Sequence, residues 1–257
     1  MVYEPSEDSF LLLKHVGKYA NGIVLDMGTG SGILAEEAAK TAEMVYAADI
    51  DGKAVDYCKK RFKQKQLKSK KIIVVQSDLF SYFAKKSIKF DLIIFNPPYL
   101  PADPNSKVKD IALDGGKHGY EVLEEFLNQM PDYLKDNGKC IILFSSLTKK
   151  EKVDDIIAKK LLVAKQIDSE KLDFEELFVY EIGKSSVLIE LAKNKITDLC
   201  YFAKGKRGLV FTGKLGKTKI AVKIKNPDSR ALNRMNFEAE MLEKLNKHNI
   251  GPKLLFS

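Results

Sequence analysis

The sequence contains no tryptophan, only three cysteines and no apolar run near the roughly 20 residues that a membrane-spanning helix needs. Cys58, Cys140 and Cys200 form no C-x-x-C pair, which excludes a disulfide framework and a zinc site recognisable from sequence. The first residues carry acids where a signal peptide carries Lys or Arg ahead of an apolar core. We therefore expect a soluble, cytoplasmic protein without a metal site or a membrane partner.

Charge is unevenly distributed along the chain. The 257 residues carry a net charge of +8 and are 45% apolar, which is enough for a folded core. Residues 194–257 hold 14 Lys and Arg against 5 Asp and Glu, whereas residues 1–193 hold 29 against 30. This shift predicts a boundary between a nearly neutral domain, residues 1–193, and a basic segment, residues 194–257.

The larger domain alternates between short apolar runs and amphipathic segments. Five runs are predicted strands: Ile23–Met27, Val45–Asp49, Ile72–Gln76, Leu92–Phe95 and Lys139–Phe144. Four segments are predicted helices: Gly32–Lys40, Lys53–Lys65, Tyr120–Tyr133 and Lys149–Lys160. Three further predicted strands follow one another too closely for parallel crossovers and must pair antiparallel: Leu162–Ile167, Leu177–Ile182 and Val187–Leu191. The predicted fold class is α/β, a doubly wound, mostly parallel sheet with an antiparallel edge.

Acidic residues follow three successive predicted strands, beside a glycine-rich turn. Gly28, Gly30 and Gly32 follow the first strand, where they allow a tight turn and close approach of the backbone to a ligand. Asp49 ends the second strand, where a carboxylate can accept both hydroxyls of a ribose, and Asp78 follows the third, where it can bond an adenine edge. An ordinary turn explains the glycines alone, but the added acids favour an adenosine-type ligand.

The fourth predicted strand runs directly into Asn96-Pro97-Pro98-Tyr99. This stretch resembles the N-P-P-Y motif of amino-group methyltransferases of the class I, S-adenosylmethionine-dependent superfamily. The residue types suit the chemistry because an amide nitrogen is a poor nucleophile. Two acceptors, the Asn96 side chain and the Pro97 carbonyl, can hold both of its N–H groups in line with an activated methyl group, while Tyr99 supplies a flat wall.

Two other stretches indicate the branch of this superfamily. Residues 3–12 resemble the opening of the archaeal and eukaryotic HemK/PrmC-like protein glutamine methyltransferases, and Leu113–Gly119 is similar to the glycine-rich loop of that branch. The resemblance covers residues 1–193 and implies S-adenosylmethionine as the cofactor, with catalytic residues Asn96, Pro97, Pro98 and Tyr99. It implies a cofactor site made of Tyr3, Pro5, Ser9, Asp26, Gly28, Gly30, Gly32, Asp49, Asp78, Leu79 and Asn96.

The same resemblance implies a reaction and two partners. The reaction is N5-methylation of the glutamine in the Gly-Gly-Gln loop of a class-1 translation release factor. Members of this branch are typically active only beside a small zinc-binding activator protein, which pairs with the sheet near the third strand. The run Lys71–Gln76 fits this interface because it is apolar on both faces, although a buried strand has the same pattern.

Part of the basic segment resembles the amino-terminal lobe of archaeal protein-kinase-like proteins. Its predicted elements are a glycine-bent hairpin, a strand and an amphipathic helix, at Phe202–Gly213, Ile220–Ile224 and Asn236–Leu245. The resemblance implies that Lys223 grips α- and β-phosphates and that Glu238 is its partner. The chain ends at Ser257 without an H-R-D or D-F-G sequence, so we expect no phosphoryl transfer by this chain alone. The segment is interpreted as a truncated gene, a relic lobe or a basic docking module.

Two other functions stay open. An N6-adenine methyltransferase acting on DNA or RNA could use Asn96–Tyr99 equally well, but it needs a region that extracts the base and holds the strand, and residues 1–193 leave no room for one. A cofactor-binding scaffold would not need the intact motif. The basic run at residues 59–71 is interpreted as the solvated end of a helix, so nucleic acid is not the favoured partner.

Overall fold

The computed structural model describes residues 3–65, 71–102, 112–205, 208–225 and 234–255. The chain forms two compact units, Met1–Glu190 and Leu191–Ser257, each with a sheet of its own. None of the helices in the described ranges is long and apolar enough to cross a membrane.

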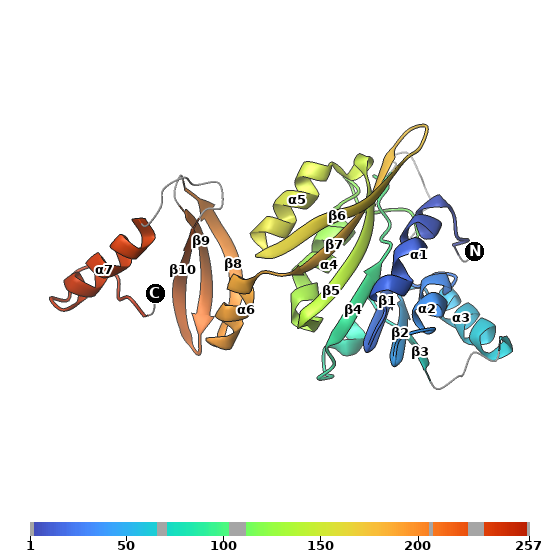
Figure 1. Cartoon of the computed structure of the whole chain (residues 1–257), viewed down its shortest axis with the longest axis horizontal. Coiled ribbons are helices and arrows are strands. Elements are labelled where there is room, and N and C mark those ends of the chain that lie inside the picture. Colours follow the sequence, from blue (N-terminus) through green and yellow to red (C-terminus); the bar gives the residue numbers. More distant parts are fainter. Residues whose placement is uncertain (1–2, 66–70, 103–111, 206–207, 226–233, 256–257) are drawn as a thin grey trace. The chain divides into compact units, whose positions relative to one another are not determined.

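The first unit is built on a seven-stranded sheet in the order β3-β2-β1-β4-β5-β7-β6 (Figure 1). Its strands are β1 (Ile23–Met27), β2 (Met44–Asp49), β3 (Ile72–Gln76), β4 (Phe90–Phe95), β5 (Leu134–Ser145), β6 (Leu162–Lys171) and β7 (Glu176–Lys184). β1 to β5 pair in parallel, and β7 pairs antiparallel with both β5 and β6. The doubly wound, mostly parallel sheet with an antiparallel edge is therefore confirmed.

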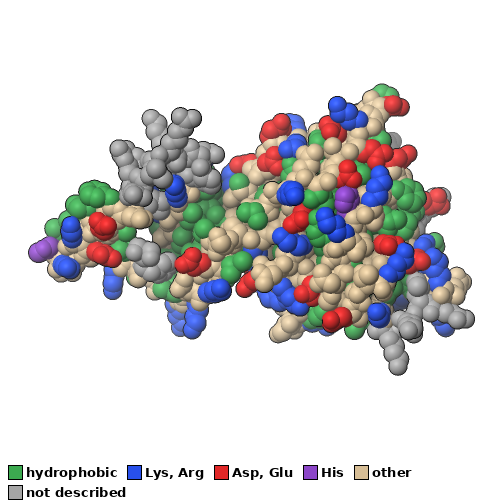
Figure 2. Space-filling model, in the orientation of Figure 1, with side chains coloured by type: hydrophobic (Ala, Val, Ile, Leu, Met, Phe, Trp, Pro, Cys, Tyr) green, Lys and Arg blue, Asp and Glu red, His purple; other side chains and the backbone are tan. Residues whose placement is uncertain are grey.

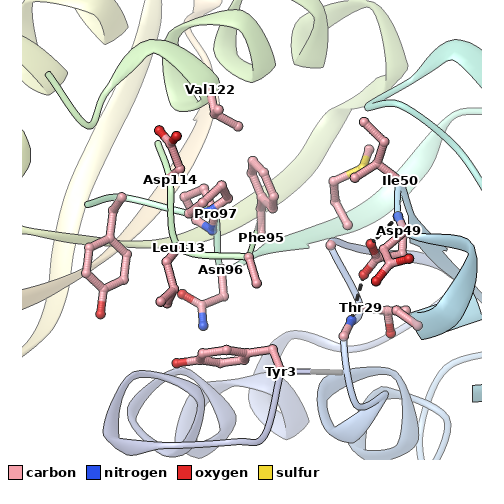
Figure 3. A pocket seen from close by; sticks show the side chains of 18 of the residues that line it. Tyr3, Thr29, Asp49, Ile50, Phe95, Asn96, Pro97, Leu113, Asp114 and Val122 are labelled. Carbon is pink, nitrogen blue, oxygen red and sulfur yellow. Dashed lines mark hydrogen bonds between the residues drawn. The ribbon is translucent and has the colours of Figure 1, made fainter. Parts of the chain in front are cut away.

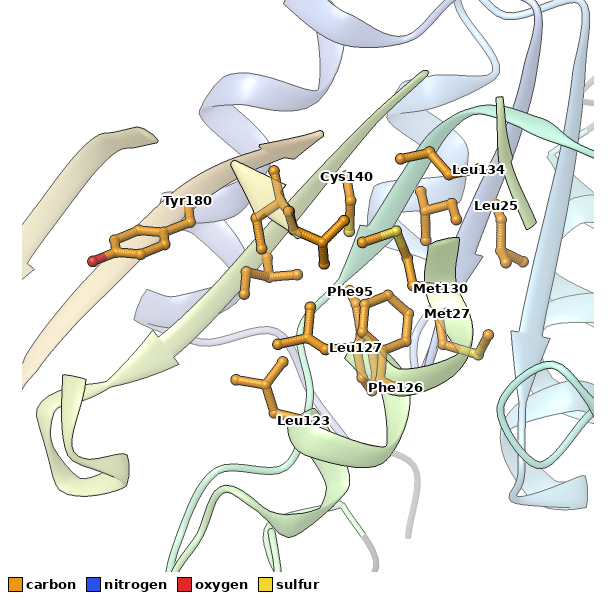
Figure 4. Packing of buried hydrophobic residues seen from close by; sticks show 14 of the residues in the cluster. Leu25, Met27, Phe95, Leu123, Phe126, Leu127, Met130, Leu134, Cys140 and Tyr180 are labelled. Atoms are coloured by element: carbon orange, nitrogen blue, oxygen red, sulfur yellow. The ribbon is translucent and has the colours of Figure 1, made fainter. Parts of the chain in front are cut away.

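Helices cover both faces of this sheet. One face carries α1 (Glu7–Tyr19), α2 (Ile33–Ala38) and α3 (Gly52–Gln64), and the other carries α4 (Glu121–Tyr133), α5 (Lys150–Lys159) and the short 3-10 helix η1 (Ser81–Phe83); a second 3-10 helix, η2 (Ser146–Thr148), follows β5. Leu92 and Ile94 of β4 pack under α1 to α3. Ile93 and Phe95 pack under α4 and α5 (Figure 4). Because successive side chains of a strand point to opposite faces, a strand buried on both faces is continuously apolar.

Two helices depart from the sequence prediction. α1 was not predicted, although it begins with two acids that favour a helix N-terminus and buries Leu11, Leu12 and Val16 along one side. The predicted strand Val187–Leu191 is wrong, because it lies within α6 (Ser186–Lys193). The hydroxyl of Ser185 accepts a hydrogen bond from the Leu188 N–H at 3.1 Å, which caps a helix.

The basic run at residues 59–71 contains the end of α3. Arg61 and Lys65 bind the Glu36 carboxylate of α2 at 2.7 and 2.6 Å, so two of its cations join neighbouring helices. Residues 66–70 of the run lie outside the described residues.

The second unit is a small antiparallel sheet followed by a helix. Its elements are β8 (Ile196–Lys204), β9 (Gly208–Leu215), β10 (Thr218–Lys225) and α7 (Arg234–Asn246), with the strands in the order β10-β9-β8. The predicted hairpin, strand and helix fall on these elements, except for residues 206–207, which lie outside the described residues. Phe211 of β9 and Val222 of β10 pair across the two strands and are both buried.

Candidate active site

A cavity of about 770 Å³ opens at the carboxyl ends of β1 to β4 (Figure 3). This is the edge at which ligands bind to open parallel α/β sheets. Most of the predicted site residues line it: Tyr3, Ser9, Gly28, Gly30, Asp49, Asp78, Leu79, Asn96, Pro97, Pro98 and Tyr99. In Figure 3, Tyr3, Asn96 and Leu113 lie on one side of the view and Thr29, Asp49 and Ile50 on the other. The cavity therefore connects the adenosine-type features to the Asn96–Tyr99 turn.

The glycine turn and Asp49 form one wall of the cavity. Gly28 and Gly30 have φ angles of +63° and +50°, which side-chain-bearing residues rarely adopt, and a Cβ on Gly28 would lie 3.2 Å from the Phe95 ring. The Asp49 carboxylate accepts hydrogen bonds from the Gly30 N–H at 2.8 Å and the Asp51 N–H at 2.9 Å. Burial raises the pKa of Asp49 above its usual value. Each carboxylate oxygen has one N–H partner and keeps the capacity to accept from a hydroxyl.

Three residues predicted to contact the cofactor, Asp26, Gly32 and Pro5, do not line the cavity. The Asp26 carboxylate is fully buried and accepts from the Thr29 hydroxyl at 2.6 Å and from a backbone N–H of α2 at 3.0 Å, so it holds the turn together from behind. Gly32 has a φ of +80°, and a Cβ there would lie 2.6 Å from the Phe62 ring, so this glycine allows α3 to pack closely. Pro5 precedes α1 and lies outside the lining.

Asn96 is held in one orientation by a residue that the sequence interpretation did not select. Asn96 Nδ2 donates to Oδ2 of Asp8 at 3.0 Å, and Asp8 is only 4% exposed. The Tyr3 hydroxyl donates to the same carboxylate at 2.9 and 3.1 Å. A carboxylate only accepts, so the Asn96 NH2 group must face Asp8 and Oδ1 must face away. Asn96 Oδ1 is buried and has no hydrogen-bond partner.

Both tyrosines of the cavity stay neutral phenols. Burial, together with the Asp8 carboxylate, raises the pKa of Tyr3 to about 12. Burial also raises the pKa of Tyr99 far above its usual value, with Asp8 and Glu175 adding to the effect. Neither phenol can act as a base near neutral pH, so their roles are limited to hydrogen bonding and to packing against a flat group.

Every charged residue in the described lining of the cavity is acidic. Its carboxylates are Asp8, Asp49, Asp51, Asp78, Asp114, Glu121 and Glu125, and the described lining residues include no Lys, Arg or His. The whole chain has the opposite sign, with a net charge of +8. Since low-dielectric walls strengthen a local potential, the cavity favours cationic ligands and disfavours phosphate groups.

The loop Leu113–Gly119 packs directly on the Asn96–Tyr99 turn. A Cβ on Gly115 would lie 2.6 Å from the Pro98 carbonyl oxygen, and one on Gly119 would lie 2.4 Å from the Tyr99 carbonyl oxygen. Leu100, the residue after the turn, donates its N–H to the Leu113 carbonyl and accepts a hydrogen bond from the Gly115 N–H. Gly115 and Gly119 therefore let the loop pack closely on the turn, while Leu113, Asp114 and Gly116 of the same loop line the cavity.

The second unit contains the ion pair that the sequence analysis singled out. Lys223 Nζ on β10 lies 2.5 and 2.6 Å from the two carboxylate oxygens of Glu238 on α7. Both side chains are largely exposed, so the pair adds little to stability.

Comparison with known proteins identifies the family of the first unit. The family described as methyltransferase small domain matches residues 6–171. Over 185 residues, 69% of this chain and 89% of the relative, the chain is 41% identical to a putative protein N5-glutamine methyltransferase of Methanocaldococcus jannaschii. Over 126 residues, 45% of this chain and 43% of the relative, it is 34% identical to the release factor glutamine methyltransferase of Streptococcus pneumoniae.

Solved structures share the fold. One is a chain of the E. cuniculi Mtq2–Trm112 complex, described as responsible for methylation of the translation termination factor eRF1; the TM-score is 0.57 at 24% identity, over 72% of this chain and 99% of that one. Another is a putative methyltransferase solved with SAH; the TM-score is 0.53 at 16% identity, over 69% and 50%. The matched family region ends before residues 194–257, whose resemblance to a kinase lobe stays a prediction. The matched residues 6–171 contain both the glycine turn and the Asn96–Tyr99 segment. We conclude from the family match and the relatives that the chain belongs to the methyltransferase small domain family, among its HemK-like members, and is an S-adenosylmethionine-dependent N-methyltransferase.

Proposed function

We propose that this enzyme methylates the side-chain nitrogen of a protein glutamine, in the Gly-Gly-Gln loop of a class-1 translation release factor. The observation that carries the proposal is Asn96 Oδ1, a buried acceptor without a partner whose orientation Asp8 sets. An acceptor in this position matches the N–H group of a planar amide.

The cavity suits the cofactor as well as the acceptor. Gly28 and Gly30 leave room where side chains would intrude, and Asp49 keeps acceptor capacity for the two hydroxyls of a ribose. The acidic lining suits a ligand that carries a sulfonium cation. S-adenosylmethionine, when bound, supplies a methyl group already activated by its positively charged sulfur.

The residues of this chain position the nitrogen rather than activate it covalently. Asn96 Oδ1 and the Pro97 carbonyl accept the two N–H groups of the glutamine amide, which fixes the nitrogen and its lone pair. As the nitrogen gains a bond to carbon, positive charge develops on it, and the same two acceptors stabilise that charge. Tyr99, neutral at physiological pH, covers the plane of the amide. One amide proton then passes to water.

The charge of the cavity favours a protein glutamine over an adenine in DNA or RNA as the methyl acceptor. An adenine in DNA or RNA arrives with phosphates on both sides, and the described lining offers seven carboxylates and no cation to receive them. The Streptococcus pneumoniae relative is named for release factor glutamine, and the Mtq2–Trm112 structure for eRF1 methylation. These names support a release factor as the acceptor, and a cytoplasmic location is part of the same proposal.

An activator subunit is part of the proposal. β3 is an edge strand of the sheet, paired on one side with β2, and its Ile73 side chain is exposed. An open apolar edge of this kind can receive a strand from another protein. The fold similarity to a protein solved with Trm112 supports a small partner of that kind at β3, and zinc binding by that partner is part of the same proposal.

The second unit is proposed to be related to the amino-terminal lobe of protein-kinase-like proteins. The Lys223–Glu238 ion pair supports the resemblance. We propose that the boundary between the methyltransferase domain and this segment lies between residues 193 and 194, at the end of α6.

The proposal is tested by incubating the full chain, with and without a candidate activator, with methyl-labelled S-adenosylmethionine and either a release-factor domain or oligonucleotides. We expect label in the protein, located by mass spectrometry on a glutamine. The Asn96→Ala variant should lose at least about 100-fold in rate while still binding S-adenosylhomocysteine. Label confined to the oligonucleotide would establish the adenine alternative instead. Label in neither acceptor with an activator present would favour a scaffold.

A further inference from the structure

The turn between β6 and β7 stands at the same edge of the sheet as the active site. Leu177 of β7 pairs with Ser145 at the end of β5, and the Glu176 N–H donates to Ser146 Oγ at 3.0 Å. Leu172, at the other side of the turn, packs against the same buried cluster as Tyr99. The turn is closed by a hydrogen bond from the Leu172 N–H to the Glu175 carbonyl at 2.8 Å. It is thus a tight, anchored structure beside the Asn96–Tyr99 segment.

Strand register gives the distance between this turn and the acceptor site. Ile142 of β5 pairs with Phe95 of β4, so Asn96 stands level with Leu143, which in turn pairs with Val179 of β7. Glu175 therefore lies two strands across from Asn96 and four residues beyond it. With strand spacings of about 4.8 Å and a rise of about 3.3 Å per residue, this separation is about 16 Å between backbones. An extended peptide covers that distance in about five residues.

Glu175 has an unused acceptor in this position. Its Oε2 atom is buried and has no hydrogen-bond partner, a property that it shares among the described residues with Asn96 Oδ1 and with Asp26 Oδ1 behind the glycine turn. Buried acceptors are costly unless a donor reaches them. The carboxylate is near enough to Tyr99 to help raise the pKa of its phenol. Two of the three unused acceptors, Asn96 Oδ1 and Glu175 Oε2, therefore lie in the neighbourhood of Tyr99.

The neighbouring residue adds an apolar anchor. Phe174 precedes Glu175 in the turn, and its side chain is 94% exposed. Aromatic side chains of this kind are frequent energetic centres of protein interfaces.

We propose that the β6–β7 turn, residues 172–175, is the docking element for the acceptor protein: Glu175 binds a Lys or Arg side chain near the target glutamine, and Phe174 packs against the acceptor surface. The inference rests on the proposed function. A cation is favoured over a neutral donor because carboxylates bind charged donors more strongly than neutral ones, and because every charged residue in the described lining of the cavity is acidic. The separation of about 16 Å, shortened by the reach of a long basic side chain, places that residue three to five positions from the glutamine.

The first test uses the wild-type chain with its activator and a series of glutamine peptides. A single Lys is moved through positions one to six on each side of the glutamine, with Glu and Gln at the same positions as comparisons. We expect KM to be lowest when Lys stands three to five residues away on one side only, about tenfold below the Gln peptide, and higher for Glu than for Gln. Equal KM values across the series would overturn the proposal.

The second test assigns the effect to Glu175. Glu175→Gln keeps the size of the side chain and should abolish the tenfold advantage of the Lys peptide, with kcat and the KM of the Gln peptide unchanged. Glu175→Lys should reverse the preference towards the Glu peptide. Asp173→Asn is the matched control, because Asp173 is an exposed carboxylate on the same turn, and this variant should keep the wild-type preference. A preference that survives in Glu175→Gln would overturn the role of Glu175.

The third test concerns Phe174 and uses the whole acceptor domain. Phe174→Ala should raise KM for the domain about tenfold and leave KM for a short peptide unchanged, because only the domain offers a surface beyond the loop. Equal effects on both substrates, or none, would remove Phe174 from the docking element. A wild-type chain that methylates no glutamine in any acceptor refutes the proposed function, whereas glutamine methylation without any charge preference refutes only this inference.

Discussion

The carboxylate of Asp8 and the carboxamide of Asn96 are 88 residues apart in the chain and share a 3.0 Å hydrogen bond. Asp8 stands in the first turn of α1, and Asn96 follows β4 in the middle of the sheet. The donor of this bond belongs to Asn96, so the bond leaves Asn96 Oδ1 turned away from Asp8 as an unpaired acceptor. The N-terminal helix thereby sets the orientation of the Asn96 carboxamide, the group that we propose receives the substrate amide.

Asp8→Asn should therefore slow methyl transfer without abolishing cofactor binding. An asparagine can donate as well as accept, so the Asn96 amide is no longer restricted to one orientation. We expect kcat to fall about 10- to 100-fold, since small misplacements of a positioning group have effects of this size, and the dissociation constant for S-adenosylhomocysteine to change less than about threefold. Single-turnover kinetics and calorimetry measure the two quantities. Glu7→Gln, a change at the exposed neighbour, is the control; an unaltered kcat in Asp8→Asn would contradict the positioning role.

Asp49→Ala should weaken cofactor binding and have little effect on the chemical step. The variant removes the acceptor assigned to a ribose and the partner of the Gly30 N–H. Hydrogen bonds to a charged group contribute about 1.5–3 kcal/mol, so the dissociation constant for S-adenosylhomocysteine should rise roughly 10- to 100-fold. Asp56→Ala, on the exposed side of α3, should bind as the wild type does. Calorimetric titration measures the dissociation constant for S-adenosylhomocysteine. Equal affinities for the two variants would show that Asp49 does not bind the cofactor.

Gly119→Ala should disturb the Asn96–Tyr99 turn from outside the cavity. The new Cβ would stand 2.4 Å from the Tyr99 carbonyl oxygen at a φ of +83°. Gly216→Ala is the control for backbone strain without a steric clash. Gly216 has a φ of +60°, and no atom lies within 4 Å of the added Cβ. Left-handed strain of about 1–2 kcal/mol applies to both variants, so Gly119→Ala should unfold at a distinctly lower urea concentration and lose activity as well. Equal stabilities and activities would show that the loop moves aside freely.

Asp26 makes stability fall as pH rises. Burial raises the pKa of Asp26 to about 7 from an ordinary value of 3.8, so the folded state holds a proton that the unfolded state has lost between these two values. The contribution is complete below pH 4 and is lost as the pH rises through about 7. At about 1.4 kcal/mol per pKa unit, the loss is about 4 kcal/mol.

Asp26→Asn isolates this contribution, since its carboxamide does not titrate. Urea unfolding at pH 5 and pH 8 should show a smaller drop for Asp26→Asn than for the wild type. Other carboxylates, such as Glu36 with its lowered pKa, titrate equally in both proteins and cancel in the comparison. An identical drop in the two proteins would mean that Asp26 stays ionised in the folded state.

Limited proteolysis of the full chain should release a resistant core that ends near Asn194. The described part of the second unit has a three-stranded sheet and few buried side chains, so it should open more readily than the first. Mass spectrometry of the early products identifies the cleavage positions. A second unit as resistant as the first would contradict this expectation.

The elements of the sheet were largely predictable because they depend on local pattern. β1 and β3 begin and end at the predicted residues. Asn96 follows a strand whose side chains are buried on both faces. The Val187–Leu191 run misled the prediction because short apolar runs suit a strand or a helix equally, and the Ser185 cap decided for a helix.

By itself the sequence determined the alternation of strands and helices, the glycine turn and the Asn-Pro-Pro-Tyr exit, since each depends on neighbouring residues. Only the tertiary structure decided that Asp8 holds Asn96, that Asp26 lies behind the turn rather than in the cavity, and that Glu175 stands unpaired near Tyr99. These relationships depend on which strands become neighbours and on which atoms lose water, and no local pattern encodes either.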